Sequence, residues 1–318
     1  MIYCKKTKNE RMIFMYNIEF GKSGLSVPTV AVGCMRISEM SEKEVSAFID
    51  TAMSYGASFF DHADIYGGGK SEEVFGKCLT PSLRDKMILQ TKCGIVRGKM
   101  YDFSYEHIVS SVEGSLKRLG TDRVDVLLLH RPDILMEPEE VARAFRKLKK
   151  DGKVLNFGVS NHTPNQIRLL ESCLDEPLCA NQMQFSIMHT PMIQSGVNAN
   201  MYNDYSFDRD GGVLDFCRLN NITIQPWSPM QHGFFKGVFI DNEDFPELNK
   251  VLSEIAEKYG VTKNTIAISW ILRHPAKMQP VTGTTNLTRL QDCLKSADVT
   301  LTREEWYEIY KAAGNKLP

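Results

Sequence analysis

The sequence predicts an α/β protein folded as a single (β/α)8 barrel (TIM barrel), with an N-terminal β-hairpin and an extra C-terminal helix. Along its 318 residues, eight short apolar runs alternate with stretches of helical periodicity. The runs are too apolar to leave one face in water, which is typical of parallel strands covered by helices. Eight units are the number that closes a barrel. The rival fold, a doubly wound open sheet, needs a G-x-G-x-x-G turn that Gly33–Ser38 lacks.

The strands follow a predicted hairpin at the start of the chain. Tyr16–Pro28 contains the turn signal Gly21-Lys22-Ser23-Gly24 between two short extended pieces. The eight barrel strands are then predicted at Thr29–Gly33, Ser58–Asp61, Met87–Lys92, Val124–Leu129, Val154–Val159, Cys179–Phe185, Ile222–Pro226 and Met278–Thr282.

Helices are predicted between these strands. Ser41 and Glu44 have the spacing of a capping box ahead of an apolar stripe from Val45 to Met53. Further stripes run over Ile108–Leu119, Val141–Leu148 (with Gly152 as the residue just past the helix), Leu248–Ile255 and, for the extra helix, Arg303–Ala313. The longest irregular stretches, Ser186–Gly212 and Ser228–Pro246, are predicted to be functional loops.

Composition excludes several classes of protein. With 38 Lys+Arg against 39 Asp+Glu, the chain offers no broad field for nucleic acid or an anionic membrane. None of the eight cysteines forms a C-x-x-C pair, so we expect no metal site and interpret them as buried small residues in a reducing compartment. No apolar run has the length of a membrane span, and we expect a cytoplasmic protein. Residues 1–15 are predicted to be a poorly ordered extension of a barrel domain spanning 16–318. No heptad seam indicates an oligomer, so the oligomeric state stays open and a monomer is compatible with the sequence.

Polar residues follow the predicted strands directly. Asp61, Lys92 and His130 end three of them, and Tyr66 comes five residues after Asp61. The carboxyl ends of barrel strands meet at one rim, where active sites lie. A Lys92 ammonium beside Tyr66 would lower the pKa of its hydroxyl from about 10, and Asp61 would keep that ammonium charged. Tyr66 could then give a proton to a carbonyl oxygen to which His130 donates a hydrogen bond.

At this point the chain resembles the aldo-keto reductase family, over roughly Tyr16 to Asp298. The residues that carry the resemblance are Asp61-x-Ala63-x-x-Tyr66-Gly67, Leu89-Gln90-Thr91-Lys92, Asp125-x-Leu127-x-Leu129-His130-x-Pro132, Gly158-Val159-Ser160-Asn161, Asn181-Gln182, and Gly283-Thr284-Thr285-Asn286 followed by Arg289. The pattern around Trp306 is similar to a bacterial branch of NADPH-dependent oxidoreductases in this family. The resemblance implies reduction of an aldehyde or ketone to an alcohol with NADPH/NADP+ as cofactor, and with Tyr66, Lys92, Asp61 and His130 as catalytic residues.

The same resemblance implies how the cofactor is held. Ser160, Asn161 and Gln182 would hold the nicotinamide carboxamide, Trp227 would stack on the ring, and Arg289 would pair with the 2′-phosphate. The full set of implied cofactor contacts is Met35, Asp61, Ser160, Asn161, Gln182, Trp227, Ser228, Pro229, Met230, Gly283, Thr284, Thr285, Arg289 and Asp292. Two departures are visible: His62 stands where many members have threonine, and Gly283 where some have a phosphate-binding lysine.

Two other functions stay open for comparison. A barrel of this kind can keep NADPH and act as a redox-sensing or regulatory subunit, and fold alone does not separate the two functions. The intact set of Asp61, Tyr66, Lys92 and His130 favours an enzyme. A barrel lyase or isomerase would instead be expected to have a carboxylate base and a pair of phosphate-binding loops. The sequence does not name the carbonyl substrate.

Overall fold

The computed structural model describes residues 15–318, so most of the predicted N-terminal extension lies outside the described residues. Eight parallel strands form one sheet in the order β11-β10-β9-β8-β5-β4-β3-β12. They are β3 (Ala31–Gly33), β4 (Phe59–Asp61), β5 (Ile88–Cys93), β8 (Val124–Leu129), β9 (Val154–Ser160), β10 (Ala180–Gln184), β11 (Thr223–Trp227) and β12 (Val281–Thr282). Each lies within or overlaps one predicted run, which confirms the predicted barrel.

The two edge strands of this sheet meet and bring the barrel close to closure. The N–H of Gln279, just before β12, donates a 3.0 Å hydrogen bond to the carbonyl of Ile224 in β11. Pro280 has no N–H to continue the ladder. This explains the largest difference from the prediction, in which the eighth strand began at Met278 instead of Val281.

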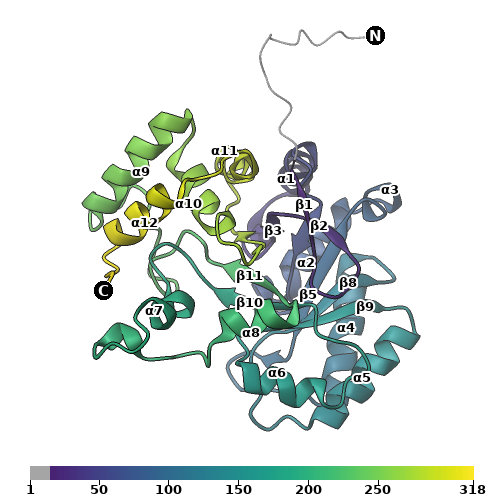
Figure 1. Cartoon of the computed structure of the whole chain (residues 1–318). Coiled ribbons are helices and arrows are strands. Elements are labelled where there is room, and N and C mark those ends of the chain that lie inside the picture. Colours follow the sequence, from purple (N-terminus) through teal and green to yellow (C-terminus); the bar gives the residue numbers. More distant parts are fainter. Residues whose placement is uncertain (1–14) are drawn as a thin grey trace, which may run out of the picture.

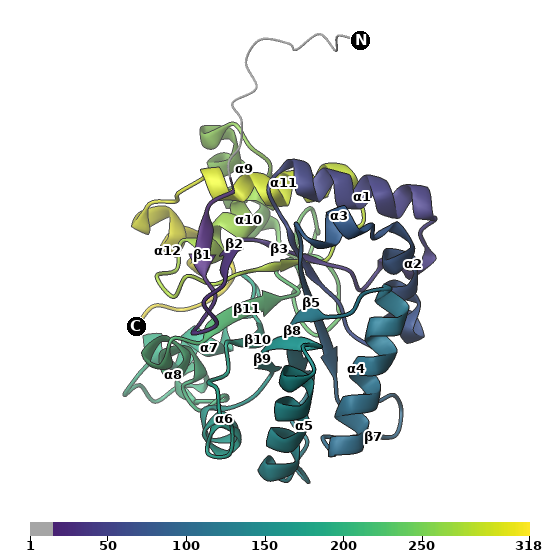
Figure 2. The same cartoon turned by 90° about the vertical axis from the view of Figure 1, so that its right-hand side faces the viewer.

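Helices form an outer layer around these strands (Figures 1 and 2). They are α1 (Glu42–Ser54), α2 (Lys70–Cys78), α3 (Pro81–Arg84), α4 (Tyr105–Leu119), α5 (Pro138–Lys150), α6 (Pro164–Glu171), α7 (Pro191–Val197), α8 (Val213–Asn220), α9 (Pro246–Tyr259), α10 (Lys263–Leu272), α11 (Leu287–Leu294) and α12 (Arg303–Ala312). Short 3-10 turns lie at Ile37–Glu39, Tyr66–Gly69, Asp204–Ser206 and Lys295–Asp298. In the described part of the chain, no helix is both long and apolar enough to span a membrane.

The predicted end signals of two helices are present. Ser41 and Glu44 form a complete capping box at the start of α1. Gly152, just past α5, has a φ of 71°, the left-handed conformation that ends a helix. One predicted loop is different: Ser186–Gly212 contains α7 and a 3-10 turn, because Pro191 starts a helix at its N1 position.

The predicted hairpin closes the amino-terminal end of the barrel. β1 (Asn17–Glu19) pairs antiparallel with β2 (Ser26–Pro28). Phe20 is buried and its ring lies 5.4 Å from that of Phe59 inside the barrel. Gly21 has a φ of 54°, and a Cβ there would collide with the carbonyl oxygen of Cys179. Only glycine therefore fits this approach of the hairpin to the strand ends.

The predicted extra helix α12 packs against α9. The indole rings of Trp270 and Trp306 stack at 4.7 Å, and each ring N–H donates to the other residue's carbonyl at 3.0 Å. Trp270 is completely buried and Trp306 is partly buried, so this contact ties α12 to the hydrophobic core.

The prediction for the cysteines is partly wrong. Cys78 and Cys173 are only half-buried, whereas Cys34, Cys93, Cys179, Cys217 and Cys293 are buried. Both half-buried thiols lie on the outer layer, at the end of α2 and just after α6. Cys4 lies outside the described residues.

Candidate active site

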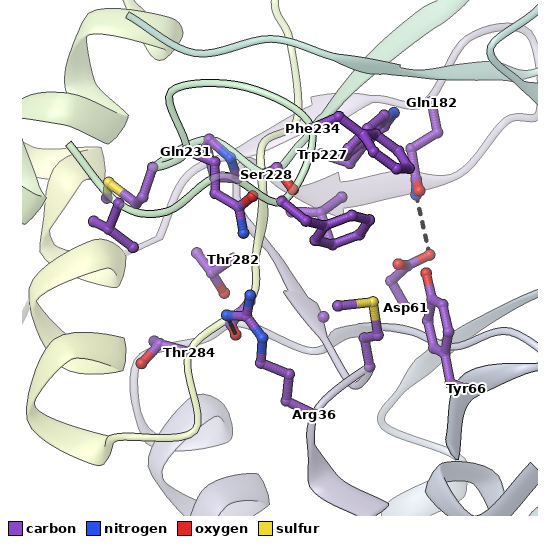
Figure 3. Close-up of a pocket in the computed structure, with 18 of the residues that line it drawn as sticks. Arg36, Asp61, Tyr66, Gln182, Trp227, Ser228, Gln231, Phe234, Thr282 and Thr284 are labelled. Atoms are coloured by element: carbon purple, nitrogen blue, oxygen red, sulfur yellow. Dashed lines mark hydrogen bonds between the residues drawn. The ribbon is translucent and has the colours of Figure 1, made fainter. Parts of the chain in front are cut away.

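A cavity of about 790 Å³ opens at the carboxyl ends of the barrel strands (Figure 3). That volume is in the range of small-molecule and cofactor sites. Each of the eight strands contributes to its lining, through its own residues or through the segment that follows it. Among the predicted site residues, it includes Met35, Asp61, Tyr66, His130, Ser160, Asn161, Gln182, Trp227, Ser228, Pro229, Met230, Gly283, Thr284, Thr285 and Arg289.

Lys92 lies beneath this lining and is completely buried on β5. Its Nζ lies 2.7 Å from the carboxylate of Asp61, 2.8 Å from the carbonyl oxygen of His62 and 3.0 Å from the hydroxyl oxygen of Tyr66. An ammonium has three N–H donors, and each has one acceptor here. The buried charge is therefore fully solvated by protein groups, and one of them is the tyrosine hydroxyl.

Asp61 is held from two further directions. Its Oδ1 accepts hydrogen bonds from the side-chain amides of Gln90 at 2.6 Å and Gln182 at 3.1 Å, the second of which is drawn in Figure 3. The Gln182 amide also donates to Gln225 at 3.2 Å. Both N–H groups of Gln182 are thus used within the protein, and its carbonyl oxygen is what it can offer to a ligand.

The expected lowering of the Tyr66 pKa is wrong for the resting site. Burial raises the pKa of Tyr66, and this outweighs the opposing effect of the Lys92 ammonium. Burial also acts on Lys92 and alone would lower its pKa, but Asp61 and Tyr66 raise it above its ordinary value. At neutral pH the site therefore holds a protonated phenol beside an ammonium, which is the state that a proton donor requires.

His130 completes the group at this end of the cavity. Its ring lies edge-on to that of Tyr66, with centroids 5.9 Å apart. Burial, with the positive charges of Lys92 and Arg131, holds the pKa of His130 well below its usual range. A neutral imidazole carries a single N–H, and Nδ1 is buried with no partner among the described residues. Because His130 lines the cavity, its other nitrogen, Nε2, is the atom available to a ligand oxygen next to Tyr66.

The residues predicted to hold the carboxamide are bonded to one another. The Asn161 amide donates to the Ser160 hydroxyl at 2.7 Å, and the Trp227 ring N–H donates to the Asn161 oxygen at 3.0 Å. Asn161 adopts a φ of 62°, which asparagine tolerates better than most residues. These contacts fix the orientation of the Trp227 indole along one wall of the cavity.

Two aromatic residues beside Trp227 were not foreseen. Phe234 and Phe235 line the cavity, with ring centroids 6.1 Å and 6.4 Å from that of Trp227. They belong to Ser228–Pro246, which was predicted to be a functional loop. The sequence marks this loop by its length, but it gives no sign of which side chains turn inward.

The other end of the cavity lies around the segment after β12. Asn286 caps α11 by accepting the N–H of Arg289 at 3.0 Å. Arg36, which was not among the predicted cofactor residues, donates to the carbonyl oxygen of Gly283 at 3.0 Å and lies beside Thr284 in Figure 3. Gly283, Thr284 and Arg289 thus share this end with a second guanidinium.

Asp292 is not placed as predicted. It does not line the cavity, and its carboxylate lies 3.7 Å from the ammonium of Lys295, the residue just after α11. In this turn of α11 it is Cys293 that faces the cavity. The pairing of Asp292 with Lys295 accounts for a carboxylate that turns away from a region where phosphate is expected.

Known proteins resemble this chain over nearly its whole length. Residues 29–313 match the family model described as "Aldo/keto reductase family". A 6-dehydroglucose reductase of Agrobacterium fabrum is 36% identical over 307 residues, with 92% of this chain and 96% of that protein covered. The uncharacterized oxidoreductase YcsN of Bacillus subtilis is 36% identical over 310 residues, with 92% and 97% covered. A crystal structure of a thermostable aldo-keto reductase with the inhibitor epalrestat has a TM-score of 0.76 at 25% identity, with 94% and 100% covered.

Proposed function

Because the chain belongs to the aldo/keto reductase family of oxidoreductases, we propose that it reduces an aldehyde or ketone to an alcohol with NADPH as the electron donor. The observation that carries the proposal is the 3.0 Å contact between the buried Lys92 ammonium and the Tyr66 hydroxyl. Tyr66 lines a cavity large enough for a dinucleotide, and Lys92 lies behind it. Tyr66 is therefore the proton donor, and the Lys92 ammonium is a fixed positive charge beside its hydroxyl.

The cavity fits a nicotinamide dinucleotide by its own chemistry. At one end, His130 Nε2 and the carbonyl oxygen of Gln182 form no hydrogen bond within residues 15–318, and both residues line the cavity. At the other end, Arg36 and Arg289 form no salt bridge within residues 15–318 and suit phosphate oxygens. The Trp227 indole adds an apolar wall to the lining. Bound NADPH would supply the hydride for the carbonyl carbon.

The protein groups would act on the carbonyl oxygen. Tyr66 donates its proton as negative charge develops on that oxygen, and His130 donates a hydrogen bond to the same atom. The phenolate that remains lies against the Lys92 ammonium, which stabilises it until solvent returns a proton. Asp61 keeps Lys92 charged throughout this cycle. Burial keeps the phenol protonated before the reaction, and the neighbouring cation favours the product of proton transfer.

The test is an NADPH-oxidation screen over aldehydes, quinones, diones and keto-sugars. Sugar aldehydes come first, because a relative is named as a 6-dehydroglucose reductase. We expect turnover with at least one class, and loss of that turnover in Tyr66→Phe. Tight NADPH binding without reduction of any carbonyl would contradict the proposal and favour a regulatory role.

A further inference from the structure

The cavity lining carries an excess of positive charge, and the proposed reaction gives a role to only part of it. Its two acidic residues are neutralised, since Asp61 pairs with Lys92 and Asp241 pairs with Lys263. None of its arginines forms a salt bridge within the described residues. These arginines are Arg36, Arg97, Arg131 and Arg289.

The four guanidinium groups fall into two pairs. Arg36 and Arg289 lie at the β12 end, where the proposed cofactor needs phosphate ligands. Arg131 directly follows His130, and Arg97 lies on the hairpin of β6 (Ile95–Val96) and β7 (Met100–Tyr101). That hairpin is tied to the loop after β8 by a 3.0 Å bond from Phe103 N–H to Asp133. The second pair therefore belongs to the end where the carbonyl would react.

Arg131 is the unusual member of this pair. It is half-buried, and burial lowers its pKa, yet an arginine in a protein stays charged. Its guanidinium lies 5.7 Å from the Trp227 ring centroid and 5.9 Å from that of Phe234. Aromatic rings attract the charge of a guanidinium but accept little from its N–H groups. Within residues 15–318 no acceptor takes a hydrogen bond from the Arg131 side chain. Burying a guanidinium without hydrogen-bond partners costs free energy, and here all its N–H donors remain free for a ligand.

We propose that the carbonyl substrate carries an anionic oxygen group (carboxylate, sulfonate or phosphate) and that Arg131 binds this group beside Tyr66 and His130. The inference rests on the proposed function, because it names the class of substrate for that same site. A guanidinium matches the paired oxygens of such groups with two parallel N–H donors. Trp227 and Phe234 lie near the guanidinium without accepting a hydrogen bond from it, so its N–H donors stay available. Arg97 also lines the cavity but is exposed to solvent, so its positive charge should attract the anionic group less strongly than Arg131 does.

The test compares substrates that differ only in charge. The neutral reference is para-formylbenzamide, and the anionic partners are para-formylbenzoate, para-formylbenzenesulfonate and para-formylphenyl phosphate. For the wild type we expect kcat/KM to favour at least one anion by roughly tenfold to a hundredfold, the usual effect of a charged hydrogen bond. Arg131→Gln should remove the preference, and Arg131→Lys should keep part of it, since lysine retains the charge but not the fork. Arg97→Gln should reduce it less.

A matched control is Arg143→Gln. Arg143 also lies against an aromatic ring, 4.5 Å from Tyr105, but on α5 outside the cavity, so its removal should leave the preference intact. If the wild type reduces the amide as well as every anion, the inference is wrong while the proposed function stands. If none of these four aldehydes is reduced, the wider carbonyl screen decides the proposed function, and ligand binding decides the inference. Para-methylbenzoate should then quench Trp227 fluorescence at lower concentration than para-methylbenzamide in the wild type but not in Arg131→Gln, and equal titrations would overturn the anion site.

Discussion

The Nζ of Lys92 lies 3.0 Å from the Oη of Tyr66, and the two atoms meet at the boundary between a dry interior and an open cavity. Lys92 is completely buried, whereas the Tyr66 hydroxyl is directed toward the cavity end that also holds His130. Burial raises the pKa of Tyr66 although the ammonium opposes it. Tyr66 therefore stays protonated before the reaction. The Lys92 ammonium stabilises the phenolate that forms when Tyr66 has given up its proton.

Tyr66→Phe should lower the rate of carbonyl reduction by roughly two powers of ten or more, the usual effect of losing a positioned acid. Binding of NADPH should be retained, because the phenyl ring keeps the shape of the site. Stopped-flow oxidation of bound NADPH would give the rate, and a nucleotide titration would give the affinity. Tyr55→Phe, at the end of α1 and outside the cavity lining, is the control. Near-normal turnover in Tyr66→Phe would remove this residue as the donor.

Lys92→Met should destabilise the fold by roughly 3–5 kcal/mol, the usual cost of leaving a buried charge without its partner. The charge left behind is Asp61, which is 2% exposed and then keeps only amide donors. Adding Asp61→Asn to Lys92→Met should recover part of the loss, because it removes that charge. Urea unfolding of the three proteins would measure the free energies of unfolding. A double variant less stable than Lys92→Met would show that the carboxylate is not the source of the cost.

Arg289→Ala should weaken NADPH binding by roughly 1.5–3 kcal/mol, the size of a charged hydrogen bond, and leave NADH binding little changed. The side chain lies in the cavity at the start of α11, and only NADPH has a 2′-phosphate for it. Asn286→Ala is the matched control: it removes the helix cap, which costs about 1 kcal/mol of stability, without removing the cation. An equal loss of affinity for both nucleotides in Arg289→Ala would place the guanidinium elsewhere than at the 2′-phosphate.

Adding NADPH should quench tryptophan fluorescence, and Trp227→Phe should remove most of that quench. Of the three tryptophans, Trp227 lines the cavity, whereas Trp270 and Trp306 stack on each other and are not in its lining. Trp306→Phe is therefore the control and should leave the NADPH-induced change in place. Full quenching in Trp227→Phe would mean that the nicotinamide does not lie against this ring.

The (β/α)8 barrel could be predicted from the sequence because each barrel strand is short, apolar and separated from the next by an amphipathic helix. The register of the strands then brings Asp61, Lys92 and His130 to one rim without further information. The ends of strands were less predictable where an N–H is missing, as at Pro280. Helix α7 was missed because it covers only Pro191–Val197 and has no long apolar stripe.

What the sequence could not give was the balance between opposing energies. A motif brings Lys92 near Tyr66, but whether burial or the ammonium decides the Tyr66 pKa depends on how much of the phenol is covered. In the same way, the letters His130-Arg131 do not reveal that the guanidinium faces two rings and no carboxylate. The orientation of Asp292 toward Lys295 also follows from local pairing that helical spacing alone leaves undetermined.

Asp64→Asn should stabilise the protein increasingly as the pH rises. Burial, and then the neighbouring Glu72 carboxylate, raise the pKa of Asp64 to about 7, and its Oδ1 is buried with no partner among the described residues. Glu72 is itself fully buried and is compensated by Arg118 at 2.8 Å and the Thr91 hydroxyl at 2.6 Å. Arg118, the Ile65 N–H and the Ser111 hydroxyl favour the ionised form of Asp64 but do not outweigh burial and Glu72, so that form is the one that the fold disfavours.

The sign follows from proton linkage. An unfolded Asp64 ionises near pH 4, whereas the folded one holds its proton until about pH 7. Between these values the folded state binds more protons, so its stability falls as the pH rises through this window and stays lower above it. Asparagine cannot ionise, and the difference between variant and wild type should therefore grow from near zero at pH 4 to roughly 1–3 kcal/mol at pH 8. Urea unfolding at several pH values would measure it, and parallel pH profiles for the two proteins would show that Asp64 ionises normally in the fold.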